Sequence, residues 1–310
     1  MEDAFKTIKL IAIDIDGTLL TPEGQITPRT RAAIRAAQQA GVIVTLATAR
    51  RYGGAQAVAE ALGIELPLIV YDGTLIVSHP TRTILASQTL EPELARQAIE
   101  IFQRHHVQPV VHPCEKERCV AEEVWTGPAE DDNPGLALYL TAAAERVKRM
   151  PSLVLNARAT QALRVVAFAE KETIEGMLPE ITGLDCTWNF APQGSYGSAE
   201  LAILAAGCSK ASGVATLAAR YQIALEQVMA LGDNYNDIEM LRMAGLGIAM
   251  GQAPEQVQAA ANAVTSTNRA DGVALAIERY VLLAYPPQTL MLANEPLEEA
   301  VFLQSFNILP

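Results

Sequence analysis

Short apolar runs alternate with amphipathic stretches along the first 73 residues of the chain. The runs that read as strands buried on both faces are 8–13 (IKLIAI), 42–47 and 66–71. Between them, Thr27 followed by Pro28 begins an alanine-rich helix that Gly41 ends, and a second helix is expected at about 54–62. This β-α-β-α-β order predicts an α/β fold with a doubly wound parallel sheet and right-handed crossovers.

The same alternation resumes near the C-terminal end, whereas the middle of the chain differs. Near the end we expect strands at 228–232 and 246–250, and helices at about 210–221, 236–244, after Pro254 and 272–283. In the middle we expect helices at 92–106 and 172–181 and strands at 107–112 and 163–169. The pattern predicts a discontinuous core domain (1–83 and 197–285), an inserted α+β domain (84–196) and a C-terminal extension (286–310).

The charge of the chain restricts its partners. The 23 lysines and arginines against 35 aspartates and glutamates give a net charge of −12, whereas duplex nucleic acid and anionic membranes attract clustered positive charge. We therefore expect neither nucleic acid nor a membrane as the main partner. Four cysteines in 310 residues are too few for a disulfide framework, and the N-terminus lacks a signal-peptide pattern. We expect a reduced, cytoplasmic protein.

Polar residues stand where the predicted strands end, which is the edge where parallel α/β sheets bind ligands. They are Asp14 and Asp16 after the first strand, Thr48 after the second, Asp233 after the strand at 228–232, and Lys210, Asn236 and Asp237 at helix starts. Taken singly, each is typical of a turn, a helix cap or a solvated surface. Taken together, they predict that carboxylates, a hydroxyl, an amide and an ammonium group converge on one site.

Converging carboxylates repel one another unless a cation neutralises them, and Mg²⁺ is the hard cation that carboxylates and phosphate oxygens share. A lysine, a hydroxyl and a helix-opening amide suit the remaining phosphate oxygens. One carboxylate can attack phosphorus to form an aspartyl phosphate. A second carboxylate two residues further on can protonate the leaving oxygen and then activate water. Gly17 lets the backbone approach closely.

Four ordered segments resemble the motifs of the haloacid dehalogenase (HAD) superfamily. They are DIDGTLL at 14–20, LATAR around Thr48, CSKASGV around Lys210 and GDNYNDIEML at 232–241. The GDxxNDxxM form and the large insertion after the third strand resemble the Cof-type subfamily with a class IIB cap. The resemblance covers about 1–83 and 197–283, and implies a Rossmann-like core with a cap that closes over the site and selects the substrate.

The resemblance also implies roles for individual residues. Asp14 would be the nucleophile and an Mg²⁺ ligand, and Asp16 the general acid/base with its backbone carbonyl on the metal. Asp233 would be a further metal ligand, and Asp237 would support the metal indirectly. The groups implied to hold the phosphoryl group are Thr48, Lys210, Asn236 and the backbone amides of Ile15 and Ala49. The implied reaction is hydrolysis of a phosphate monoester, such as a sugar phosphate or a related small metabolite.

Two alternatives to the phosphatase stay open. A phosphomutase or other phosphotransferase uses the same aspartyl phosphate and differs in whether the closed cap excludes water. A catalytically idle metabolite-binding protein is the other. The chain also departs from the family pattern twice, with Ala49 in place of glycine and Asp72-Gly73 in place of Asn-Gly. Asp72 is either a turn residue or a charge that weakens phosphate binding or favours a cationic substrate.

Other groups of the chain are less informative. A histidine and cysteine segment (His105, His106, His112, Cys114 and Cys119) lacks the paired spacing of zinc ligands. Arg50 follows Thr48 closely enough to contact phosphate or a substrate carboxylate. We interpret Trp188 as part of the hydrophobic core of the inserted domain, in preference to a stacking surface.

Overall fold

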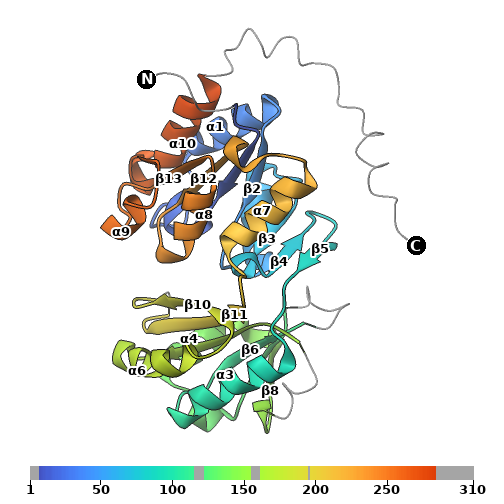
Figure 1. Ribbon diagram of the computed structural model, residues 1–310, viewed down its shortest axis with the longest axis vertical. Coiled ribbons are helices and arrows are strands. Elements are labelled where there is room, and N and C mark those ends of the chain that lie inside the picture. Colours follow the sequence, from blue (N-terminus) through green and yellow to red (C-terminus); the bar gives the residue numbers. More distant parts are fainter. Residues whose placement is uncertain (1–6, 115–121, 155–160, 195, 284–310) are drawn as a thin grey trace, which may run out of the picture.

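The computed structural model describes residues 7–114, 122–154, 161–194 and 196–283. Two lobes lie one above the other, and the ends of the described chain are both in the upper lobe (Figure 1). The lower lobe is built from the middle of the sequence (Figure 1). None of the helices in these residues combines the length and the apolar character that crossing a membrane requires.

A parallel five-stranded sheet forms the centre of the upper lobe, in the order β14-β13-β12-β1-β2. Its strands are β1 (Leu10–Ile13), β2 (Ile43–Leu46), β12 (Val228–Gly232), β13 (Leu246–Ala249) and β14 (Ala263–Val264). A bridge between Ala47 and Ile69 joins β2 to a smaller antiparallel sheet. That sheet contains β3 (Leu68–Val70), β4 (Leu75–Val77) and β5 (Ile84–Ser87).

Helices cover both faces of the parallel sheet. One face packs against α1 (Pro28–Gln39), α2 (Tyr52–Leu62) and α10 (Gly272–Ile277), the other against α7 (Lys210–Arg220), α8 (Ile238–Met243) and α9 (Glu255–Gln258). In β1, Ile11 and Ile13 face the first set, and Leu10 and Ala12 face the second. Because the strand is buried on both sides, its sequence is continuously apolar. The predicted doubly wound α/β fold is confirmed.

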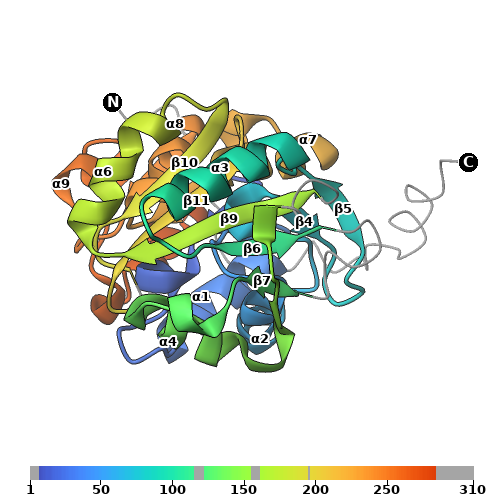
Figure 2. The same ribbon diagram turned by 90° about the horizontal axis from the view of Figure 1, so that it is seen from below.

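A six-stranded sheet forms the lower lobe, in the order β10-β11-β9-β6-β7-β8. Its strands are β6 (Val110–Pro113), β7 (Val124–Thr126), β8 (Val147–Arg149), β9 (Ala162–Ala169), β10 (Cys186–Ala191) and β11 (Ala199–Ala205). Seen from below, α3 (Pro92–Arg104) and α6 (Lys171–Ile181) cross the outer face of this sheet (Figure 2). The helix α4 (Pro134–Ala143) packs on part of the opposite face, which leaves the rest of that face toward the upper lobe.

The pairing of β5 and β11 favours boundaries of the inserted domain that lie later in the chain than expected. The strand β5 pairs with β4 of the upper lobe, so the chain leaves that lobe after Ser87 and not at 84. The strand β11 pairs with β9 and β10, so the chain returns after Ala205 and not at 197. An apolar strand reads the same whichever sheet it joins, so the sequence did not indicate which lobe Ala199–Ala205 would join. We propose limits of about 89–205 for the inserted domain; the extension at 286–310 lies outside the described residues.

The histidine and cysteine segment forms no shared ligand site among the described residues. The His105 ring Nε2 lies 2.7 Å from a Glu180 carboxylate oxygen, and the buried His112 Nε2 lies 3.0 Å from the Tyr139 hydroxyl. Cys114 is disulfide-bonded, which differs from the expectation of reduced cysteines, and Cys119 lies outside the described residues. His105, His112 and Cys114 therefore each interact with a different partner.

Candidate active site

A cavity of about 440 Å³ lies between the lobes, at the carboxyl end of the parallel strands. The residues predicted from the sequence that line it are Asp14, Asp16, Thr48, Ala49, Lys210 and Asn236. The lower lobe contributes lining residues from β10 and β11, among them Asn189 and Glu200. The remaining predicted residues, Ile15, Asp233 and Asp237, lie behind this lining next to Asp14.

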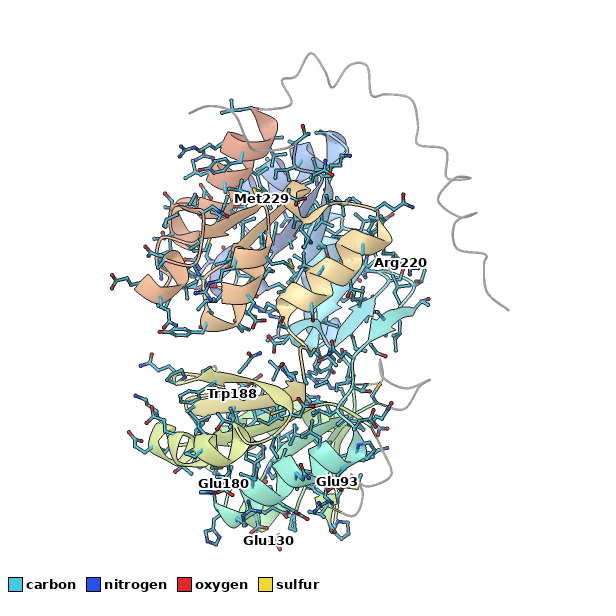
Figure 3. The ribbon with its side chains drawn as sticks, in the orientation of Figure 1. Glu93, Glu130, Glu180, Trp188, Arg220 and Met229 are labelled. Carbon is cyan, nitrogen blue, oxygen red and sulfur yellow. The ribbon has the colours of Figure 1, made fainter. Side chains whose placement is uncertain are left out.

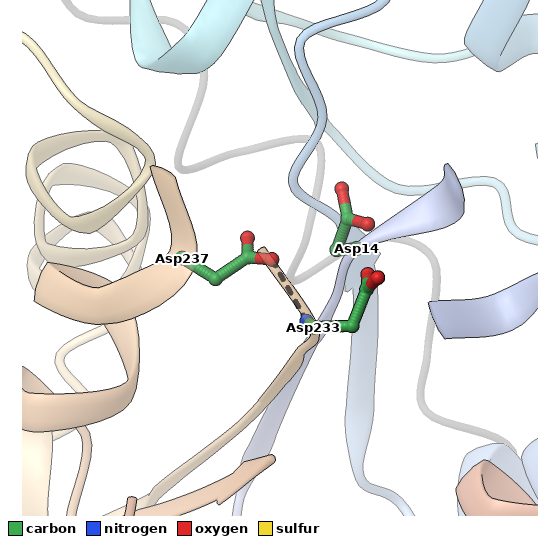
Figure 4. A group of neighbouring side chains, drawn as sticks. All are labelled: Asp14, Asp233 and Asp237. Atoms are coloured by element: carbon green, nitrogen blue, oxygen red, sulfur yellow. Dashed lines mark hydrogen bonds between the residues drawn. The ribbon is translucent and has the colours of Figure 1, made fainter. Parts of the chain in front are cut away.

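Three carboxylates gather next to the cavity, and one of them, Asp14, lines it (Figure 4). Asp14 and Asp233 follow β1 and β12, which are parallel neighbours with Ile13 opposite Leu231, so their side chains emerge side by side. Asp237 comes from the short helical turn after β12. One oxygen of each carboxylate lies within 4.8 Å of the others, and no other group in the described part of the chain has such ligand geometry.

Lys210 is the counter-ion of this acidic cluster. Its ammonium is 2% exposed and lies 2.7 Å from Oδ1 of Asp14 and 2.7 Å from Oδ1 of Asp237. Burial alone would lower the pKa of Lys210, but the two carboxylates outweigh it and raise that pKa. Burial raises the pKa of Asp14 well above its ordinary value, against the opposing charge of Lys210. One ammonium therefore does not neutralise the cluster.

Asp237 is held entirely by hydrogen bonds within the upper lobe. Its Oδ1 accepts from Lys210, and its Oδ2 accepts from the backbone N–H groups of Asp233 and Asn234 at 3.0 Å each (the bond to Asp233 is dashed in Figure 4). With no exposed surface, Asp237 fixes both the ammonium and the loop that carries Asp233. This geometry suits the indirect metal-supporting role implied by the motif.

The loop after β1 also shapes the position of Asp233. The Thr18 hydroxyl donates to Oδ1 of Asp233 at 2.8 Å. Gly17 has φ +84°, and a Cβ at this residue would lie 2.2 Å from Oδ2 of Asp233. The glycine therefore allows the close approach expected from the sequence, whereas the role of Thr18 was missed. Burial raises the pKa of Asp233 to about 6, although the Thr18 hydrogen bond opposes this shift.

Asp16 faces the cavity in a different setting from Asp14. Its side chain is largely exposed and pairs with Arg50, whose Nε donates to Oδ2 at 2.7 Å. Arg50 also donates to the backbone carbonyl of Gly54. The structure thus places Arg50 against the expected general acid/base, whereas the sequence suggested a contact with phosphate or a substrate carboxylate.

Both departures from the family pattern contact one arginine of the inserted domain. Arg164, from β9, donates to the backbone carbonyl of Ala49 at 3.1 Å and lies 3.8 Å from Oδ2 of Asp72. Asp72 has φ +55°, as expected for a turn residue, and its Oδ1 accepts from the Asn236 amide at 2.8 Å. The charge of Asp72 is therefore paired within the protein. Nothing in the local sequence singled out Arg164.

Comparison with known proteins agrees with this geometry. A family model described as haloacid dehalogenase-like hydrolase matches residues 11–277. The pyridoxal phosphate phosphatase YbhA of Escherichia coli is 27% identical over 286 residues, covering 89% of this chain and 100% of that protein. The 5-amino-6-(5-phospho-D-ribitylamino)uracil phosphatase YcsE of Bacillus subtilis is 30% identical over 278 residues, covering 89% and 96%.

Solved structures share the fold. A haloacid dehalogenase-like hydrolase from Bacteroides thetaiotaomicron superposes with a TM-score of 0.71 at 25% identity, over 88% of this chain and 99% of that one. A HAD subclass IIB sugar phosphatase superposes with a TM-score of 0.72 at 24% identity, over 88% and 98%. The chain belongs to the haloacid dehalogenase-like hydrolase family. Within that family it is a Cof-type phosphatase. The inserted domain, which contributes to the cavity from the lower lobe, is called the cap below.

Proposed function

We propose that this phosphatase hydrolyses monoesters of small metabolites with Mg²⁺, through an aspartyl phosphate on Asp14. The observation that carries the proposal is the convergence of Asp14, Lys210 and the acidic cluster at one wall of a cavity that the cap closes. The relatives named above are phosphatases of pyridoxal phosphate and of a phosphoribitylamino-uracil, which supports a small phosphorylated metabolite as substrate.

The residues present fit a divalent cation. Asp14, Asp233 and Asp237 offer hard oxygen atoms within 4.8 Å of one another, and Lys210 alone does not neutralise them. Burial, and after it the neighbouring carboxylates, raise the pKa values of Asp14 and Asp233, so both carboxylates would gain from a bound cation. Asp14, Asp233 and the backbone carbonyl of Asp16 would hold Mg²⁺, with Asp237 orienting the loop. Bound there, Mg²⁺ supplies positive charge that draws in and orients a phosphate oxygen.

The chain's own residues then account for both chemical steps. Lys210 holds Oδ1 of Asp14, which leaves Oδ2 to attack phosphorus and form the aspartyl phosphate. Asp16, once released from its ion pair with Arg50 and protonated, gives that proton to the departing ester oxygen. Asp16 next takes a proton from a water molecule that attacks the same phosphorus. The phosphorus–Asp14 bond breaks, inorganic phosphate leaves and the Asp14 carboxylate is restored.

The test is phosphate release from a panel of phosphorylated metabolites and p-nitrophenyl phosphate, with Mg²⁺ or with EDTA. We expect Asp14→Asn to lower kcat by at least about a thousandfold, as removal of a nucleophile does. Asp131→Asn, at an exposed position of the cap, is the matched control and should leave turnover unchanged. Turnover retained by Asp14→Asn would refute the nucleophile, and turnover retained in EDTA would refute the metal. Release that requires a bisphosphate activator would favour a mutase.

A further inference from the structure

A carboxylate of the cap enters the cavity from the side opposite the acidic cluster. Glu200 lies in β11 and pairs with Phe168 of β9 and Ala191 of β10. Alternate residues of β11, Leu201 and Ile203, pack in the core under α3 and α6. Because neighbouring residues of a strand point to opposite faces, Glu200 points away from those helices, and it lines the cavity.

The aromatic residues of β10 lie on the opposite face of the sheet from Glu200, although Trp188 and Phe190 also border the cavity. Trp188 and Phe190 pair with Ile203 and Leu201 and pack against the same helix-covered core. Figure 3 shows Trp188 within the cap, at its border with the core domain. Trp188 thus packs against the cap core, as expected, but it is only partly buried and also borders the cavity. Asn189 alternates with these rings and lines the cavity, so its amide and the Glu200 carboxylate are the polar side chains of the two strands that face the site.

Glu200 differs from the other acidic residues of the cavity because it has no counter-ion. Asp14 pairs with Lys210, Asp16 with Arg50 and Asp72 with Arg164. Among the residues that the structure describes, no donor hydrogen-bonds the Glu200 carboxylate and no cation lies within 4.0 Å of it. Burial raises the pKa of Glu200, although the charge of Arg164 opposes the shift from beyond ion-pair distance. A half-buried carboxylate of this kind gains from any cation that enters the cavity.

We propose that Glu200 selects substrates whose leaving group carries a protonated nitrogen, an inference that rests on the proposed phosphatase function. The phosphoryl group would lie against Asp14 and Lys210, and the nitrogen would pair with Glu200 across the cavity. A hydroxyl group would also donate a hydrogen bond but would leave the charge uncompensated, and charge-assisted bonds are roughly twice as strong as neutral ones. The sequence suggested Asp72 as a charge that could favour a cationic substrate. Because Asp72 is paired with Arg164, Glu200 takes that role in this proposal.

The backbone of Glu200 is rigid enough for such selection. The strand β11 is paired on both sides, with β9 and β10, and binding groups on paired strands hold their position better than groups on loops. The cavity volume of about 440 Å³ is in the range of sites for small metabolites. Glu200 is therefore a substrate-binding residue that sets specificity and takes no part in the chemical steps.

The test compares kcat/KM within two matched pairs of esters in the presence of Mg²⁺. The pairs are O-phosphoethanolamine with 2-hydroxyethyl phosphate, and glucosamine 6-phosphate with glucose 6-phosphate. The members of each pair differ only in an amine against a hydroxyl. We expect the wild type to prefer the amine in at least one pair, and Glu200→Gln to lower that preference at least about tenfold, or about 1.4 kcal/mol. Glu130→Gln removes a cap charge on the side away from the core domain and should keep the preference (Figure 3).

Thermal unfolding tests whether Glu200→Gln changes specificity directly or by destabilising the fold. Glu200→Gln removes an unpaired, half-buried charge, so the metal-free variant should unfold at the same temperature as the wild type or at a higher one. Hydrolysis of these esters without an amine preference, or a preference that survives Glu200→Gln, would overturn the inference alone. If the wild type releases phosphate from no ester at all, the proposed function itself fails and the inference fails with it.

Discussion

Replacing Asp233 with asparagine should stabilise the metal-free protein while it removes the response to Mg²⁺. Asp233 lies next to two further carboxylates, and Lys210 is the cation that contacts both of those. Asparagine has nearly the same shape, and its Oδ1 still accepts the hydrogen bond from Thr18. The substitution therefore removes charge repulsion and a metal ligand, with little change in packing.

The magnitude follows from the pKa of this carboxyl group. A rise from 3.8 to about 6 on folding corresponds to about 3 kcal/mol, since one pKa unit is 1.36 kcal/mol. Between these values the folded protein binds a proton that the unfolded chain does not, so the stability contributed by the group falls as pH rises through about 4 to 6. The full cost is present above pH 6. We expect Asp233→Asn to recover about 2 kcal/mol at pH 7.5 and only about a third of that at pH 4.5.

Urea unfolding in EDTA at pH 7.5 and pH 4.5 measures this effect, with Asp131→Asn as a control at an exposed position. Adding Mg²⁺ at pH 7.5 should stabilise the wild type, because the ion binds the folded state, and should do little for Asp233→Asn. The reasoning is refuted if the metal-free variant is less stable than the wild type at pH 7.5, or if its gain is the same at pH 4.5.

Two further predictions concern Gly17, next to Asp233, and Arg164, next to Asp72. Gly17→Ala should lower the free energy of unfolding by at least about 1 kcal/mol, because a Cβ at φ +84° would overlap the Asp233 carboxylate. For the same reason it should weaken Mg²⁺ binding, measured by calorimetry. An unchanged Mg²⁺ affinity would contradict this. Arg164→Met should cost about 3 kcal/mol in urea unfolding by leaving Asp72 buried and unpaired. Adding Asp72→Asn should restore at least half of that loss, and a double variant no more stable than Arg164→Met would count against the pairing.

The sequence was sufficient to predict the elements that depend on neighbouring residues. The apolar run of β1 and the Thr27-Pro28 start of α1 are properties of neighbouring residues, and the structure has both elements there. The cluster of Asp14, Asp233 and Asp237 was also predictable, because parallel strands end at one edge of a sheet whatever loops join them. The four motifs then pointed to the family, which the comparisons show.

The partners of these elements depended on contacts between distant residues. The strand β11 pairs with β9 in the lower lobe, whereas the expected boundary at 197 would put its residues in the core. The sequence of an apolar strand does not indicate which sheet the strand joins. Thr18 gained its role when it met Asp233, 215 residues further along the chain in the same lobe, and Arg164 when it met Ala49, 115 residues away in the other lobe. Glu200 gained its role when β11 came to line the cavity between the lobes. The sequence by itself determined the α/β core, its acidic strand ends and the existence of an inserted domain. The tertiary structure decided which acidic residues of the cavity are paired and that Glu200 has no ion-pair partner among the described residues, because pairing depends on distances that residue order does not specify.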